Sequence, residues 1–309
     1  MQRPRKRGAM PVNPASSRSG AVAFAAAGIA LLCFMDAVIK HLVATNDTLV
    51  VVFGRYLFAS IFAAVIWLKA RRPAITPEMW RAHGLRAVVI SACAVAFFWS
   101  LTALPLVEVV VISFLAPLLM PFTARLMLGE RIRPRNVGAG LAGFAGVIVA
   151  SVGAPAEAAI QTRLLGIAAV LFAAVTYAIS MTMLRGRAGK DGPEIAGLLA
   201  ALLPGAIVSG PAIVTGGLPP ASDIPAFIAL GLFAAGGMYF FAKAYASAET
   251  QVLAPLEYTA LIWAAGIGWF LFAEPVRPQV WVGAALIIAA CLWGAREEKA
   301  LSQAGSAAA

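Results

Sequence analysis

The sequence predicts an all-α membrane protein with ten transmembrane helices, arranged as two inverted five-helix repeats around a central cavity. Three observations lead to this prediction. Hydrophobic residues make up 61% of the chain and charged residues 12%, whereas soluble domains have about 45–50% apolar and about 25% charged residues. The apolar residues fall in runs long enough to cross a bilayer, and two of these runs end in similar sequences.

Each apolar run has the length of a membrane-spanning helix, because roughly 20 residues cross a hydrocarbon core of about 30 Å. The connections between the runs are short. The predicted spans are residues 20–43, 48–68, 84–103, 106–127, 136–153, 164–184, 195–215, 224–245, 251–272 and 279–295. The first run exceeds the apolar region of about 7–15 residues in a signal peptide, so we expect it to remain as the first span.

Lysine and arginine residues between the spans predict the orientation, because cytoplasmic loops are enriched in both. With the N-terminus inside, 19 of the 24 fall in cytoplasmic segments and only Arg163 and Arg277 fall outside. This distribution requires an even number of spans, which agrees with ten and places both termini in the cytoplasm. The predicted location is therefore the plasma membrane, which in a bacterium is the inner membrane.

The repeat is visible where the fourth and ninth spans end. Residues 128–134 read LGERIRP, and residues 272–278, placed 144 positions later, read FAEPVRP. With five spans in each half, Glu130 lies inside and Glu274 outside, as an inverted repeat requires. We expect a cytoplasmic basic tail at 1–19, a first repeat at 20–153, a connecting loop at 154–163, a second repeat at 164–295 and a cytoplasmic tail at 296–309.

Several classes of protein and site are not supported by the sequence. The net charge of +10 is spread between apolar runs and forms no single basic face, so no nucleic-acid partner is expected. The three cysteines all fall inside apolar runs and are expected to be small core residues. The G-x-G-x-x-G pattern at 138–143 opens a span, where small residues serve helix packing and not dinucleotide binding. No enzyme, cofactor or metal site is predicted, and the composition is compatible with a monomer.

Ionisable residues inside the first two spans are the first candidates for a site, since a charge at mid-membrane costs roughly 2.5–3.5 kcal/mol on insertion scales. Asp36 and Lys40 are four residues apart and share one helix face. One interpretation is that the two pair with each other and Lys40 extends to the outer surface. The other is that they line a cavity, with Arg55 of the second span pairing with Asp36. Glu108, at the outer start of the fourth span, is expected at the membrane interface.

The second half supplies further candidates. Tyr239 and Lys243 share a face of the eighth span, and Lys243 could instead extend to the inner surface. Glu257 follows the helix-kinking Pro255 by two residues and is adjacent to Tyr258.

The 144-residue offset compares equivalent positions of the two halves. It maps Trp99 onto Lys243 and Ser113 onto Glu257, so equivalent positions differ in charge. Such asymmetry is expected of a cavity that binds an asymmetric, partly charged solute. Its apolar walls would come from Trp99, Tyr177, Tyr239 and Tyr258. The alternative for each aromatic residue is ordinary helix packing or interfacial anchoring.

Together these residues resemble the EamA-type transporters of the drug/metabolite transporter superfamily, and among them the bacterial amino-acid and metabolite exporters. The resemblance covers about residues 20–295 and rests on the two repeats, the helix ends at Gly129-Glu130 and Glu274-Pro275, and Asp36-x-x-x-Lys40 followed by Arg55. It implies alternating access to a central cavity, with a small-molecule solute and the lipid bilayer as partners. Rocking of the two halves would expose that cavity to each side in turn.

Secondary transport of amino acids is the first functional expectation. The protein would export a broad range of them, including apolar and aromatic ones, or similar small metabolites across the inner membrane. Asp36 or Glu257 would bind the amine, and Lys40, Arg55 or Lys243 the carboxylate. The alternative is uptake or efflux of a cationic or nucleoside-linked solute, such as S-adenosylmethionine or a drug-like amine.

Overall fold

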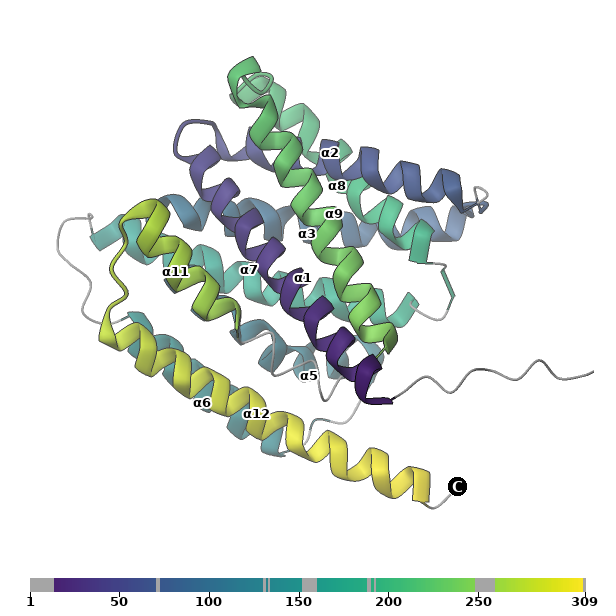
Figure 1. Ribbon diagram of the computed structural model, residues 1–309, viewed down its shortest axis with the longest axis vertical. Coiled ribbons are helices and arrows are strands. Elements are labelled where there is room, and N and C mark those ends of the chain that lie inside the picture. Colours follow the sequence, from purple (N-terminus) through teal and green to yellow (C-terminus); the bar gives the residue numbers. More distant parts are fainter. Residues whose placement is uncertain are drawn as a thin grey trace, which may run out of the picture.

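The computed structural model describes residues 14–70, 73–129, 132, 134–151, 160–187, 190–191, 193–247 and 259–307 (Figure 1). Within these residues the protein is helical and contains no strand. The elements are α1 (Pro14–Val43), α2 (Thr48–Lys69), α3 (Pro77–Ala103), α4 (Leu106–Ser113), α5 (Leu115–Leu128), α6 (Pro134–Ser151), α7 (Ile160–Arg187), α8 (Pro193–Thr215), η1 (Ala221–Asp223), α9 (Ile224–Ser247), α11 (Ala260–Phe272) and α12 (Pro278–Ala307).

Helix length and hydropathy agree with a protein that crosses the membrane several times. Six stretches within the described residues are long and apolar enough to span a bilayer, and four shorter apolar helices lie at 136–151, 221–237, 260–272 and 278–293. The all-α prediction is therefore confirmed. The count of ten spans stays a prediction.

The repeat predicted from the sequence is also present in the helix boundaries. Shifting α3 by 144 residues gives 221–247, the range that η1 and α9 occupy together. The ends of α5 and α11 match in backbone conformation as well. Gly129 has φ 71° and Ala273 has φ 52°, and each donates its N–H to the carbonyl five residues earlier, that of Ala124 or Gly268.

The main helix contacts join one half of the sequence to the other. Figure 1 shows α1 beside α9 and α6 beside α12, and α3 packs along α7 in the same way. A shift of 144 residues maps α1 onto α7 and α3 onto α9, so it maps the α1–α9 pair onto the α7–α3 pair. The same shift maps α2 onto α8 and α6 onto α12, so each of these two pairs joins equivalent helices of the two halves. The two halves are therefore interlocked. A rocking motion of the halves as separate bodies, as the sequence suggested, does not fit this packing.

The fourth predicted span is divided into α4 and α5 by a break at Phe114. Pro117 explains the position, because a proline lacks the N–H that would bond the carbonyl four residues earlier, here Ser113, and its ring clashes with that carbonyl. Pro204 and Pro211, by contrast, lie inside the continuous helix α8.

Small residues bring α6 and α12 close together. A Cβ atom built on Gly146 would lie 2.9 Å from the carbonyl oxygen of Gly283, and one on Gly138 would lie 2.8 Å from the Trp293 side chain. A Cβ on Gly143 would overlap the side chain of Leu118 of α5. The predicted packing role of the glycine-rich run is confirmed.

Candidate functional site

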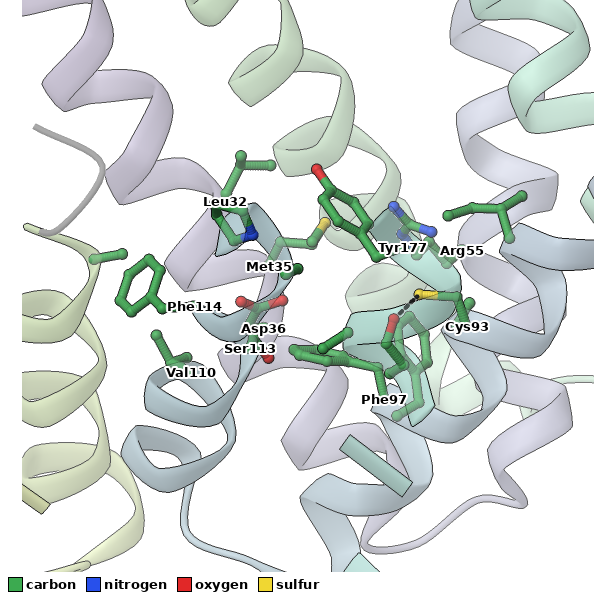
Figure 2. Close-up of a pocket in the computed structure, with 18 of the residues that line it drawn as sticks. Leu32, Met35, Asp36, Arg55, Cys93, Phe97, Val110, Ser113, Phe114 and Tyr177 are labelled. Carbon is green, nitrogen blue, oxygen red and sulfur yellow. Dashed lines mark hydrogen bonds between the residues drawn. The ribbon is translucent and has the colours of Figure 1, made fainter. Parts of the chain in front are cut away.

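A cavity of about 380 Å³ lies between α1, α2, α3, α4, α5 and α7, with Ala260 at the start of α11 on its border (Figure 2). Helix α3 contributes residues at helical spacing on one face, namely Ile90, Cys93, Ala94 and Phe97. The walls are mostly apolar, and the two ionisable side chains of opposite charge among the described lining residues are Asp36 and Arg55.

Asp36 from α1 and Arg55 from α2 both line this cavity. The predicted ion pair between them does not form, and neither has an ion-pair partner within the described residues. The Arg55 guanidinium lies over the rings of Tyr56 and Phe98, with its carbon 4.9 and 5.8 Å from their centres. Its buried Nε has no hydrogen-bond partner.

Aromatic side chains form much of the wall. Tyr177, a predicted wall residue, lines the cavity and is 41% exposed. Trp99 is not among the described lining residues; its neighbours Phe97 and Phe98 are, together with Tyr56. The sequence reasoning missed these three, although Phe97 shares the α3 face of Ile90 and Cys93, and that spacing could have identified it.

Two polar lining groups are already satisfied within the protein. Ser113 Oγ donates to the carbonyl of Val109 at 2.7 Å, and Cys93 Sγ to that of Ala173 at 3.3 Å (Figure 2). The other two cysteines, Cys33 and Cys291, are likewise buried, and none of the three forms a disulfide, as expected. The charged groups that the described lining residues offer to a solute are those of Asp36 and Arg55.

The remaining second-half candidates cannot be placed at the cavity wall. Tyr239 and Lys243 belong to α9, but their side chains are outside the described part of the structure. Glu257 and Tyr258 lie outside the described residues. Their assignment to the site stays a prediction.

Lys40 is engaged at one end of the helices and not in the cavity. Its Nζ lies 2.6 Å from Oε1 of Glu274 and donates to the carbonyl of Leu104 at 2.9 Å. Glu274 Oε2 accepts a hydrogen bond from the Leu106 N–H at 3.0 Å. The predicted pair of Lys40 with Asp36 is therefore wrong, because a residue from the other half of the chain lies closer.

Glu108 is buried at this same end, with 2% of its surface exposed. Its Oε2 lies 2.9 Å from Nη2 of Arg163, and its Oε1 accepts a hydrogen bond from Arg277. The expected position at the membrane interface stays a prediction, and within the protein Glu108 is buried. Two arginines cover the carboxylate, and they are the same two that the sequence places outside.

The opposite end of α3 carries a separate charged cluster. His83 and Asp191, both buried, meet at 3.1 Å, and Arg187 donates to both Asp191 carboxylate oxygens at 2.9 Å. These Arg187 hydrogen bonds, with a further one from His83, hold the pKa of Asp191 below its usual value despite burial. No group of His, Cys, Asp and Glu within the described residues has metal-binding geometry.

Comparison with known proteins gives consistent results. The model of the EamA-like transporter family matches residues 19–152 and 164–294. A riboflavin transporter of Rhizobium johnstonii is 29% identical over 79% of this chain and 78% of its own length. One from Brucella anthropi is 26% identical, over 83% and 90%.

A pseudopaline exporter of Pseudomonas aeruginosa is 24% identical over 86% of this chain and 92% of its own length. One solved crystal structure, 21% identical, covers 92% of this chain and 99% of its own with a TM-score of 0.62. That likeness supports the fold.

Proposed function

Since this chain belongs to the EamA-like transporter family, we propose that it carries a small polar metabolite across the inner membrane through the cavity between α1, α2, α3, α4, α5 and α7. The observation that supports this proposal most is the pair Asp36 and Arg55. Both face one cavity, and neither has an ion-pair partner among the described residues. Burying an uncompensated charge is costly, so a bound solute with complementary groups would stabilise both side chains.

The size and walls of the cavity limit the solute. Its volume of about 380 Å³ is near the lower end of the range of roughly 300–1,000 Å³ for small-molecule sites. The exposed ring of Tyr177 favours a planar solute, and the Arg55 guanidinium, which lies over Tyr56 and Phe98, is held in position to bind a carbonyl or carboxylate.

Riboflavin and related heteroaromatic metabolites are therefore the first solutes to test. The aromatic wall supports this choice, as do the two similar proteins named riboflavin transporters. Amino acids, especially aromatic ones, are the second candidate, because a zwitterion offers an amine to Asp36 and a carboxylate to Arg55. Direction is part of the same proposal, with export expected for amino acids.

We infer the topology from the sequence and the family match together. Ten spans, two inverted repeats at 20–153 and 164–295 and cytoplasmic termini account for the lysine and arginine distribution. Reporter fusions after Ala309 and within residues 154–159 test it. We expect the two reporters to lie on opposite sides of the membrane, because five predicted spans separate them. Reporters on the same side would refute this odd number of spans.

The central experiment measures flux into and out of proteoliposomes, with riboflavin, aromatic amino acids and S-adenosylmethionine as labelled solutes, with and without a pH gradient. Arg55→Gln and Asp36→Asn should each weaken the apparent affinity for the transported solute. A hydrogen bond to a charged group contributes about 1.5–3 kcal/mol, which corresponds to roughly 10- to 150-fold.

Matched controls are Arg125→Gln and Asp223→Asn, which remove the same charges away from the cavity. Both should transport like the original protein. Counter-flow of labelled solute separates a carrier from a channel. Unchanged affinity in both cavity variants would remove Asp36 and Arg55 from solute binding.

A further inference from the structure

Three ion pairs at one end of the helices all join the first half of the chain to the second. Lys40 pairs with Glu274, and Glu108 pairs with Arg163 and Arg277. We call these five residues the end network. They come from α1, α4, α7 and the segment between α11 and α12.

Fully buried apolar side chains lie between the cavity residues and the end of the helices that carries the network. On α1, α2, α3, α4 and α7, one residue about a turn beyond the cavity on this side is almost inaccessible. These residues are Ile39 on α1, Val51 on α2, Leu101 on α3, Leu106 on α4 and Val170 on α7, each at most 2% exposed. Along these helices, buried apolar side chains and then the end network lie between the cavity residues and that end.

Three of the five end-network residues have no charged counterpart in the repeat. Under the 144-residue shift, Lys40 corresponds to Leu184, Glu108 to Val252 and Arg163 to Ser19, whereas Glu274 and Arg277 correspond to Glu130 and Arg133. The ends of α5 and α11 are otherwise built alike. The end network is therefore not repeated by the scaffold at the opposite end, where the described residues form other ion pairs between the halves, Arg187 with Glu78 and His83 with Asp191.

Buried ion pairs suit a closure that must open. The cost of removing charges from water offsets most of their attraction, so they contribute little to stability, but they require one relative position of their helices. When those helices separate and water enters, each charge regains its hydration. The end network therefore requires one arrangement of the helices in the closed state but stabilises that state only slightly, so it does not prevent opening.

We propose that the end network is an ionic gate of the transport path, which breaks when the cavity opens to that side. This inference rests on the proposed function for its role in transport. Helix α1 links the two sites, because Asp36 in the cavity and Lys40 in the gate are one turn apart on the same face. Solute binding at Asp36 can therefore alter the turn of helix that carries Lys40.

The test measures access to the buried apolar side chains beyond the cavity without any solute. Leu101→Cys is placed in a background in which the three native cysteines are alanine. Its labelling rate with a membrane-impermeant methanethiosulfonate is measured in sealed vesicles, with the reagent on one side at a time. Glu274→Gln and Glu108→Gln should each raise the rate from one side about 5-fold or more, the lower end of typical conformational coupling.

Two controls separate gating from misfolding. Glu78→Gln removes an ion pair between the halves at the opposite end, with Arg187, and should leave the rate unchanged. The exchange of Lys40→Glu with Glu274→Lys should restore slow labelling. An unchanged rate in both gate variants, or a raised rate that the exchange does not reverse, would overturn the gate. Failure of every solute in the flux assay, with labelling as expected, would instead reject the proposed solutes.

Discussion

The α6–α12 crossing makes a quantitative prediction, through Gly283→Ala. A Cβ at this position would lie 2.5 Å from the carbonyl oxygen of Gly146 and 2.6 and 2.7 Å from Cβ and N of Ala150. Two of these three atoms are backbone, so no side-chain rotation relieves the overlap. Ordinary contacts between heavy atoms are about 3.5–4.0 Å, so the two helices must move apart by about 1 Å.

The expected cost follows from two opposing effects. Overpacking a close contact costs about 1–3 kcal/mol, and replacing glycine by alanine inside a helix returns about 1 kcal/mol. Gly266→Ala in α11 isolates the second effect, because a Cβ there meets nothing within 4 Å. The two variants should therefore differ in the free energy of unfolding by about 1–3 kcal/mol, a factor of roughly 5–150 in the folded-to-unfolded ratio.

Equilibrium unfolding by sodium dodecyl sulfate in mixed micelles measures this difference, with circular dichroism as the signal. The detergent fraction at the unfolding midpoint should be lower for Gly283→Ala than for the original protein, or nearly equal to it. For Gly266→Ala it should be higher. Equal stability of the two variants would refute close α6–α12 packing as the role of these glycines.

Three other outcomes are expected. Arg55→Lys should keep the charge but lose the flat guanidinium over Tyr56 and Phe98, so solute affinity in flux assays should fall nearly as far as in Arg55→Gln; recovery to the original affinity would show that charge alone matters. Ala273→Gly should increase the free energy of unfolding by up to about 1 kcal/mol and so raise the thermal midpoint, because Ala273 has positive φ; a lower midpoint would contradict backbone strain at Ala273. The folded-state pKa of Asp191 is depressed, chiefly by Arg187, so its contribution is present above the usual value of about 3.9 and is lost as pH falls through the folded pKa. The stability difference between Asp191→Asn and the original protein should therefore be largest near neutrality and shrink below about pH 4, as melting curves at both pH values can establish.

The helices and the internal repeat could be predicted from the sequence, because both leave a pattern in residues that are close together in the chain. Apolar runs mark the helices, and the shared ending at 128–134 and 272–278 marks the repeat whose helix ends have matching conformations. Pro117 predicts an interruption of the fourth span, and the structure places the break at Phe114, within one turn before that proline. Spacing shows which residues share a face, but not which other helix covers that face.

The partners of the charges could not be predicted for that reason. Lys40 has an acidic residue one turn away in Asp36, yet it pairs with Glu274, which is far away in the chain and close in the fold. Glu108 was placed by its position near a span end, whereas its burial depends on Arg163 and Arg277 from the other half. Asp36, Arg55 and Tyr177 were found because a charge or polar ring inside an apolar span is conspicuous without knowledge of the fold.

The interlocked halves have a consequence for synthesis. Helix α1 ends at Val43, and its main packing partner α9 begins at Ile224. At about 5–20 residues per second, a ribosome needs roughly 10–35 s to cover the intervening chain. During this time α1 is in the membrane without that partner, with Asp36 about two turns from its C-terminal end. We expect the newly inserted first half to depend on lipid or an insertion factor until α9 arrives, and to be the stage at which assembly most often fails.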